Sequence, residues 1–368
     1  MKHVKSLEVR LYNKTVGHLA LTSDGLCAFE YSHEWLATGF AISPFELPLR
    51  SGVFIAKSSP FEGGFGVFDD CLPDGWGMLI MDRFLQQKGI NPQTLTLLDR
   101  LSLVGLNGRG ALEFYPDFSE FEDDEAVDFN QLNKAVEAIL DDRTYSGNGI
   151  GELYRRGGSP GGARPKIFVK YNDAEWLVKF RAKEDPKNIG KQEFHYAEIA
   201  KACGLKMMDC RLFEEQFFGT KRFDRTDSGE KIHVVSMAGL LCADYRIPCI
   251  DYLHVFQVAS ELTHNMAELW NIYRLMCFNY LINNKDDHAK NFAFLCKNGN
   301  WHFAPAFDLL PSEGMNGFHT TSFNNSITPS DTNLIELAKR VGLNEKEAKE
   351  TLNTMRLIVS NKKQSFGC

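Results

Sequence analysis

The stretch LINNKDDHAKNFAFLCKNGNWHFAPAFDLLPS, residues 281–312, decides how the second half of this chain is interpreted. Five side chains that resist burial crowd into six of its positions: Asp286, Asp287, His288, Lys290 and Asn291. Apolar runs on both sides of an Asn-Gly pair, Asn298 and Gly299, predict a β-hairpin. A further carboxylate, Asp308, follows in an aromatic run. The stretch is therefore expected to form a loop, a hairpin and a second loop.

The polar residues of this stretch have a spacing with chemical meaning. Asp286 and Asn291 are five residues apart, as are the Asp and Asn of the protein-kinase catalytic loop. In that loop the Asp accepts the proton of the substrate hydroxyl, and the Asn binds Mg²⁺. A hairpin would return Asp308 to Asn291, and together they offer the oxygen ligands that Mg²⁺ prefers. Solvated loop carboxylates would give the same short pattern, so upstream residues have to decide.

A glycine-rich segment lies upstream, in RRGGSPGGARPK at residues 155–166. Backbone N–H groups approach an anion closely where side chains are absent, so the segment is a candidate phosphate loop. A flexible surface loop is the alternative. Two strands joined by a turn are expected next, at 167–180, with Lys179 near the end of the second. A buried ammonium needs an anionic partner, and a nucleotide phosphate together with an acidic side chain would serve, with Glu193 on the next helix as the candidate. The alternative is that Lys179 extends from an edge strand to solvent.

Composition limits the class of protein. The 368 residues are 43% hydrophobic and 24% charged, which is typical of a soluble globular chain of two or three domains. A net charge of −7 argues mildly against autonomous DNA binding. Nine cysteines without a C-x-x-C pair are expected to be reduced and cytosolic. The longest apolar run, residues 269–282, is too short and too polar to cross a bilayer, so a cytoplasmic protein is expected.

The order of predicted elements indicates an α+β fold. Alternating residues at 6–31 predict a small antiparallel sheet, and the segment 68–88 predicts a helix that stops at Gly89. Acidic residues at 117–130 predict a connection between domains, although a solvated helix start fits nearly as well. Strands are expected up to about Arg225. The rest is mostly helical, with two helices at 251–282 and a last helical region near the end of the chain.

Four segments resemble the signatures of the HipA family of bacterial serine/threonine kinases, the toxins of HipBA-type toxin–antitoxin systems. They are GGARPK (161–166), KRFDR (221–225), DDHAKNF (286–292) and FDLLPS (307–312). LPDGWG (72–77) is similar to part of the small domain that precedes the kinase core in that family. The resemblance implies a two-lobed, protein-kinase-like fold in three parts. These are a small β-rich N-terminal domain (1–117), a kinase N-lobe with glycine-rich loop and linker (118–225), and a helical C-lobe with the catalytic loop (226–368).

Residue roles follow from the same resemblance. It implies ATP and Mg²⁺ as cofactors, Asp286 rather than Asp287 as catalytic base, and Asn291 and Asp308 as metal ligands. Ser159 would be the site of autophosphorylation, although a turn serine is the plainer reading. Lys221 to Phe223 would be the hinge against the adenine, with Phe223 as an apolar wall. The implied ATP site comprises Gly161, Gly162, Ala163, Arg164, Pro165, Lys166, Lys179, Glu193, Lys221, Arg222, Phe223, His288, Ala289, Lys290, Asn291 and Phe307.

Partners are implied as well: a HipB-like DNA-binding antitoxin, a protein substrate such as an aminoacyl-tRNA synthetase, DNA only through the antitoxin, and no membrane. About sixty residues follow Asp308, which is shorter than the toxin's helical lobe. The tail at 337–352 is interpreted as part of that lobe, with a DNA-reading helix pair as the alternative. The loop DDHAKN also agrees with the D-x-H-x-x-N of lipid kinases. A kinase of lipids or small molecules, or a nucleotide-binding co-repressor, therefore stays open.

Overall fold

A computed structural model describes residues 2–120, 127–142, 144–157, 162–314 and 317–365. The chain forms two compact units. Unit 1 comprises Met1–Lys191, Cys210–Val235 and Gly239–Cys242, and unit 2 comprises Gln192–Asp209, Ser236–Ala238 and Ala243–Cys368. Each unit is described by itself below. The division into three parts at residues 117 and 225 stays a prediction.

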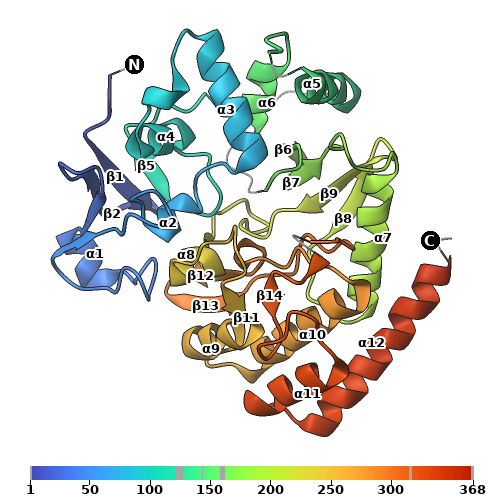
Figure 1. The fold of residues 1–368 in the computed structure, drawn as a ribbon. Coiled ribbons are helices and arrows are strands. Elements are labelled where there is room, and N and C mark those ends of the chain that lie inside the picture. The colour runs from blue at the N-terminus through green and yellow to red at the C-terminus, as the bar shows by residue number, and fades with distance from the viewer. Residues whose placement is uncertain (1, 121–126, 143, 158–161, 315–316, 366–368) are drawn as a thin grey trace. The chain divides into compact units, whose positions relative to one another are not determined.

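Unit 1 begins with a five-stranded antiparallel sheet in the order β4-β3-β2-β1-β5 (Figure 1). Its strands are β1 (Ser6–Leu11), β2 (Lys14–Leu21), β3 (Cys27–Tyr31), β4 (Val53–Ile55) and β5 (Glu113–Tyr115). Leu7, Val9 and Leu11 are fully buried, while the residues between them are not, so β1 shows the period of two that a half-buried strand requires. The antiparallel sheet predicted at residues 6–31 is confirmed.

Short helices connect the strands of this sheet. They are α1 (His33–Thr38), α2 (Gly66–Asp69), α3 (Gly75–Gln87), the 3₁₀ turn η1 (Pro92–Thr94) and α4 (Leu97–Val104). α3 ends just before Gly89, whose φ of 75° is left-handed, and this confirms the predicted stop. Thr96 and Asp99 form a reciprocal capping box that starts α4. The end of α3 and the start of α4 are therefore set by residues that lie close by in the sequence.

A second antiparallel sheet of unit 1 carries the candidate phosphate-binding residues. Its order is β6-β7-β9-β8, with β6 (Lys166–Tyr171), β7 (Ala174–Lys179), β8 (Cys210–Phe213) and β9 (Phe217–Lys221). Asn172 and Asp173 both have positive φ, 48° and 57°, as a two-residue hairpin turn demands. The hairpin predicted at 167–180 is confirmed. The helices α5 (Phe129–Asp141) and α6 (Ile150–Gly157) share a hydrophobic core with α3, β6 and β7.

Unit 2 is mostly helical and contains the stretch quoted at the outset. Its elements include β11 (Ile250–Asp251), α9 (Tyr252–Thr263), α10 (Met266–Ile282), η2 (Ala289–Asn291), β12 (Ala293–Lys297), β13 (Asn300–Phe303), β14 (Thr321–Ser322), α11 (Asp331–Arg340) and α12 (Glu345–Ser365). The two helices predicted at 251–282 are confirmed as α9 and α10. β12 and β13 pair antiparallel around Asn298 and Gly299, which confirms the hairpin. Three elements, α7 (Ile189–Ala202), β10 (His233–Ser236) and α8 (Met237–Leu241), contain residues of both units.

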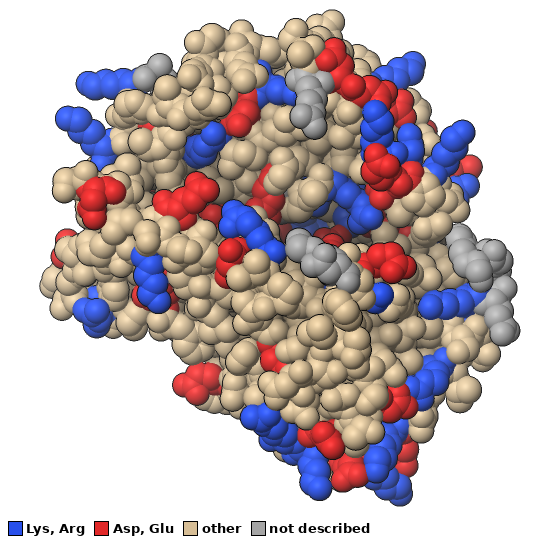
Figure 2. Space-filling view, in the orientation of Figure 1, with Lys and Arg blue, Asp and Glu red and all other residues tan. Residues whose placement is uncertain are grey.

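The C-terminal helices α11 and α12 bear on the DNA-reading alternative. Leu334, Leu337 and Leu352 are buried, so each helix packs an apolar side. Figure 2 shows Lys and Arg mixed with Asp and Glu over these helices. Glu345 forms ion pairs with both Lys339 and Lys349. A nucleic-acid surface needs a continuous basic patch, so this mixture of signs favours the interpretation as lobe core and lobe surface.

The cysteines that the structure describes are free thiols. Most are buried or half-buried, and Cys249 is the exposed one among them. Burial raises the pKa of the Cys27 thiol to about 12, so it stays protonated at neutral pH. No helix in the described part of the chain is long and apolar enough to cross a membrane.

Candidate active site

The loop after α10 begins at a helix end that the sequence encodes locally. Asn283 has φ 60° and ψ 43°, and its left-handed conformation terminates α10. The loop then runs through Asp286 and Asp287 to η2 and the β12–β13 hairpin. These two adjacent carboxylates occupy very different surroundings, and that difference determines which of them can do chemistry.

Asp287 is buried and accepts hydrogen bonds from four groups. Its Oδ1 accepts the backbone N–H of Thr320 (2.9 Å) and of Thr321 (3.2 Å). Its Oδ2 lies 3.0 Å from His319 Nδ1 and accepts a bond from Tyr252 Oη at 3.4 Å. The Thr321 hydroxyl also donates to the Asp287 carbonyl. A carboxylate held in this way fixes the loop to the segment 319–321 and is closed to a substrate.

Asp286 faces the other way, with 60% of its side chain exposed. Its backbone is nevertheless held on both sides. Its N–H donates to Asn284 Oδ1 (3.3 Å), and its carbonyl accepts Asn291 Nδ2 (2.6 Å). His288 Nε2 lies 3.9 Å from the carboxylate. A fixed backbone with an accessible carboxylate suits a general base, so the geometry favours Asp286 over Asp287 for that role.

Asn284 connects this loop to the second predicted carboxylate, Asp308. Its Nδ2 donates to the Asp308 carbonyl (3.2 Å) and to Asn279 Oδ1 (3.0 Å). Asn279 in turn donates to Tyr252 Oη (2.9 Å), the same hydroxyl that reaches Asp287. A continuous chain of hydrogen bonds therefore runs from Asp287 to Asp308. It holds the two ends of the predicted catalytic stretch in one arrangement.

Asp308 and Asn291 are the predicted magnesium ligands. Asp308 has φ 54°, a left-handed conformation that Asp tolerates better than most residues. The amide nitrogen of Asn291 is used for Asp286, which leaves its Oδ1 as the ligand atom. Among the described residues no group of three or more His, Cys, Asp and Glu side chains forms a metal site. Two oxygen ligands from the protein fit Mg²⁺, which retains waters and takes further ligands from phosphates.

Other predicted ATP residues line the same loop. Ala289 is buried, and His288 and Phe307 are half-buried. The Lys290 ammonium lies 4.2 Å from the centre of the Tyr245 ring, and the His288 ring packs on the same tyrosine at 5.8 Å. A cation over an aromatic face is stabilised by the ring quadrupole. Tyr245 therefore supports two residues of the loop, and no signal in the sequence pointed to it.

The candidate phosphate site of unit 1 centres on two lysines. Lys166 on β6 and Lys179 on β7 are directly paired residues of the hairpin, and both are buried. Directly paired residues share a face of the sheet, where like charges repel one another. An anion on that face would relieve the repulsion. The Lys179 ammonium also lies 5.7 Å from the centre of the Phe218 ring.

The described part of the glycine-rich loop is tied to other parts of unit 1. Gly162 has φ 98°, a left-handed conformation that favours glycine, and a Cβ there would lie 2.7 Å from Lys166 Nζ. Its N–H donates to Asp74 of the LPDGWG segment (3.2 Å). Arg164 forms a two-point ion pair with Asp185, with distances of 3.0 Å from Nε to Oδ2 and from Nη2 to Oδ1.

Three predicted residues cannot be placed beside this loop. Ser159 and Gly161 lie outside the described residues. Glu193 is buried on α7 but belongs to unit 2, so its pairing with Lys179 stays a prediction. Pro165 accepts the N–H of Phe180 through its carbonyl (2.8 Å), which ties the loop to the end of β7.

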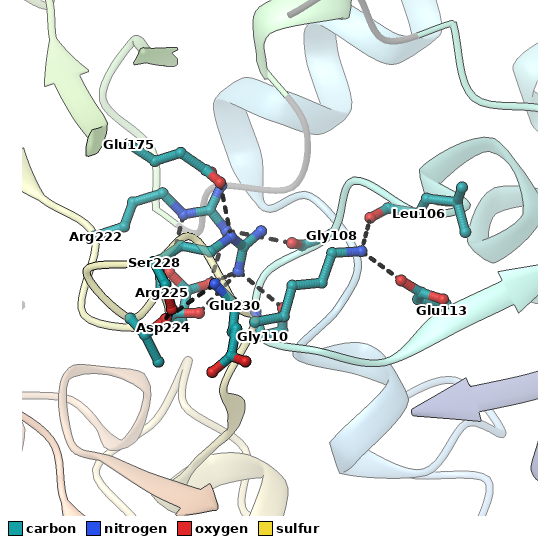
Figure 3. A network of polar contacts seen from close by, with 12 residues as sticks. Leu106, Gly108, Gly110, Glu113, Glu175, Arg222, Asp224, Arg225, Ser228 and Glu230 are labelled. Carbon is teal, nitrogen blue, oxygen red and sulfur yellow. Dashed lines mark hydrogen bonds and ion pairs between the residues drawn. The ribbon is translucent and has the colours of Figure 1, made fainter. Parts of the chain in front are cut away.

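The predicted hinge, Lys221 to Phe223, continues into a network of buried ions. Lys221 pairs with Asp227 at 2.6 Å, and Phe223 is half-buried. The Arg222 guanidinium is buried against Asp224 and Glu175, so its side chain serves the protein structure (Figure 3). A contact of this hinge with adenine would therefore come from Phe223 and the backbone.

Comparison with known proteins adds to this geometry. The family model described as the HipA-like C-terminal domain matches residues 158–362, which is more than half of the chain. The chain belongs to the HipA family. A second model, the HipA N-terminal domain, matches residues 7–115. The predicted membership in a family of bacterial serine/threonine kinase toxins is confirmed.

The individual relatives that match this chain are distant in sequence. The serine/threonine-protein kinase toxin HipA of Shewanella oneidensis is 24% identical over 350 residues, covering 83% of this chain and 75% of the relative. A solved complex of HipA, HipB and operator DNA from the same organism superimposes with a TM-score of 0.70 at 18% identity, covering 97% of this chain and 90% of the HipA chain. This likeness confirms the predicted HipA-like α+β fold with its β-rich N-terminal region.

Sequence reasoning missed several residues that support the candidate site. Asn279 and Asn284 sit at the end of a long apolar helix and just after it, where buried amides are a detectable signal. His319 and Tyr252 contact Asp287 from positions 32 and 35 residues away. Only the folded chain brings these partners together.

Proposed function

We propose that this chain is an ATP- and Mg²⁺-dependent serine/threonine protein kinase, the toxin of a toxin–antitoxin pair, regulated by autophosphorylation at Ser159. The observation that best supports this proposal is the contrast between the surroundings of two neighbouring carboxylates. The Asp287 carboxylate is buried and hydrogen-bonded, while the Asp286 carboxylate is exposed. The backbone N–H and carbonyl of Asp286 are both hydrogen-bonded. Asn284 bonds both this loop and Asp308, so base and metal ligand share one support.

In the proposed reaction Asp286 accepts the proton of a serine or threonine hydroxyl as that oxygen bonds to the γ-phosphorus of ATP. The bond between this phosphorus and the β,γ-bridging oxygen breaks, and ADP leaves. Asn291 and Asp308 would hold Mg²⁺, which neutralises phosphate charge when bound. Lys166 and Lys179 would face the phosphates, and their mutual repulsion would be relieved by them. Phe223 would pack on the adenine. The remaining residues of the proposed ATP site are those given in the sequence analysis.

Ser159 lies within the glycine-rich segment 155–166, and a phosphate there would add negative charge to a segment proposed to bind phosphates. Repulsion from ATP would then favour a loop position that excludes the nucleotide. For partners, we propose a HipB-like antitoxin through which DNA is contacted, because the solved relative is a complex with HipB and operator DNA. The mixed charges on α11 and α12 fit contact with DNA through the antitoxin.

The test is intact mass and peptide mapping after incubation with ATP and Mg²⁺, starting from dephosphorylated protein. Wild type should gain one phosphate on Ser159, and Ser159→Ala should lose that label. Asp286→Ala should react roughly 10²- to 10⁴-fold more slowly because it lacks the general base. It should still bind ATP.

A matched control is Asp141→Ala, which removes an exposed carboxylate with one ion pair, to Lys183 at 2.9 Å. This variant should react like wild type. Full activity of Asp286→Ala would reject the assigned base. Wild-type protein that binds ATP but transfers no phosphate to itself or to added protein would reject the kinase proposal.

A further inference from the structure

Four charged side chains in unit 1 form a closed ring next to the proposed adenine hinge. Arg222 makes a two-point pair with Asp224, with Nε to Oδ1 at 2.9 Å and Nη2 to Oδ2 at 2.7 Å. Glu175 bridges the two arginines, 3.0 Å from Arg222 Nη1 and 3.1 Å from Arg225 Nε. Arg225 Nη1 completes the ring at 3.2 Å from Asp224. Two positive and two negative charges balance, as burial requires.

This ring is bonded to the backbone of a loop from the N-terminal domain, residues 106–110 (Figure 3). The Gly110 N–H donates to Asp224 Oδ2 (2.7 Å), and the Gly110 carbonyl accepts Arg225 Nη1 (3.0 Å). The Gly108 carbonyl accepts Arg222 Nη2 at 3.4 Å. Hydrogen bonds from side chains to both backbone groups of one residue fix where that residue lies. Apolar packing alone would not fix it.

Glycine is needed where the loop meets the ring. Gly110 has φ 77°, and a Cβ there would lie 3.2 Å from the backbone nitrogen of Val234. A second anchor holds the other end of the loop, where Lys231 Nζ donates to the Leu106 carbonyl and pairs with Glu113, both at 2.6 Å. The loop 106–110 is therefore fixed at both ends.

The two arginines of the ring stabilise the ionised form of Asp224. Burial alone would raise the pKa of Asp224, but the guanidinium groups of Arg222 and Arg225 hold it far below its usual range. Asp224 is therefore ionised at neutral pH.

The loop also reaches the hinge residue itself. The Arg109 guanidinium lies over the Phe223 ring, 5.7 Å from its centre. The Arg222 N–H donates to the Glu175 carbonyl (2.9 Å), so the hinge continues the pairing of β9 with β7, the strand that ends at Lys179. Ring and loop together fix where Phe223 lies relative to the strand of the phosphate-facing lysine.

We infer that the N-terminal domain is part of the nucleotide site: its loop 106–110, acting through the ring, positions Phe223 and so sets the affinity for the adenosine part of ATP. Asp224, Glu175 and Arg109 are then positioning residues that need not touch the nucleotide. The inference rests on the proposed function, because it requires the hinge to bind adenine.

The experiment uses full-length protein and measures KM for ATP, kcat and thermal stability. Glu175→Gln weakens one half-exposed corner of the ring, and Asp224→Asn removes its central charge. Both should raise KM for ATP roughly 3- to 30-fold with kcat at saturating ATP little changed. Competition by adenosine should weaken in parallel, while competition by inorganic tripolyphosphate should not.

The matched control is Arg100→Gln, which breaks an ion pair to Asp82 (2.7 Å) elsewhere in the N-terminal domain. It should lower the melting temperature without moving KM. Wild-type KM in folded Glu175→Gln and Asp224→Asn, or an equal rise in Arg100→Gln, would overturn the inference while leaving the kinase proposal intact. A wild-type protein that binds no ATP would instead overturn the proposed function and this inference together.

Discussion

Asp224 in unit 1 and Asp287 in unit 2 are both buried, and the two are held by opposite means. Asp224 in unit 1 is surrounded by guanidinium groups, so charge balances charge. Asp287 in unit 2 is held by two backbone N–H groups, a tyrosine hydroxyl and a histidine. The first arrangement fastens a strand end to a distant loop. The second turns a loop so that the neighbouring Asp286 faces outward. Buried aspartates thus position the proposed hinge through ion pairs and the proposed base through hydrogen bonds.

The largest effect should come from removing the carboxylate that balances charge. Asp224→Ala leaves Arg222 and Arg225 buried without their central counter-ion, and we expect a loss of about 3–5 kcal/mol in the free energy of unfolding. Denaturant titration measures it. The double variant Asp224→Ala/Arg222→Met should recover part of the loss, because it removes one unpaired cation. A double variant no more stable than the single one would show that charge balance is not what the ring contributes.

A smaller loss of stability is expected for changes at Asp287, because its hydrogen-bond partners are mostly neutral. Asp287→Asn keeps the shape but presents an NH₂ group to donors, and we expect a loss of about 2–3 kcal/mol. The adjacent exposed Asp286→Asn is its natural control and should change stability by less than about 0.5 kcal/mol. Melting curves of the pair give the comparison. Equal losses in the two variants would contradict the assignment of one residue to structure and the other to chemistry.

The smallest effect concerns the buried imidazole of His233. Burial lowers the pKa of His233 to about 4, although its hydrogen bond to the Ile42 carbonyl raises it somewhat. The unfolded chain, with a histidine pKa near 6.5, therefore binds its proton first as pH falls. Stability from neutral His233 is complete above about pH 6.5 and declines by about 2 kcal/mol between pH 7 and pH 5. His233→Gln should lose this decline.

Glu46 titrates in the same pH range, and its effect on the stability of the fold has the opposite sign. Burial raises the pKa of Glu46 to about 7, so the folded state binds this proton more tightly than the unfolded chain does. Its contribution to stability therefore grows as pH falls from about 7 towards the unfolded value near 4.3. Comparing His233→Gln and Glu46→Gln with wild type across this range separates the two. Parallel curves for wild type and His233→Gln would show that His233 is not the titrating group.

Local signals explain what the sequence could predict. The two hairpins follow from Asn172-Asp173 and Asn298-Gly299, which take left-handed conformations at little cost. The spacing of Asp286 and Asn291 follows from one short loop. The supports of the site could not be predicted in this way. Asp224 binds Gly110 across 114 residues, and Asn284 binds Asp308 across 24. Such pairs depend on tertiary packing, which no periodicity in the chain encodes.

The exposed thiol of Cys249 is a site at which a fluorescent dye could be attached close to the proposed catalytic loop. Its Sγ donates to the Asp244 carbonyl (3.1 Å), next to Tyr245, the residue on which His288 and Lys290 pack. Partial burial and the Asp244 carboxylate raise the pKa of this thiol, so attachment of a maleimide dye needs mildly alkaline buffer. Most other described thiols are buried and would be labelled slowly. A fluorophore at position 249 would then report movements of the loop in real time, without changing any residue of the protein.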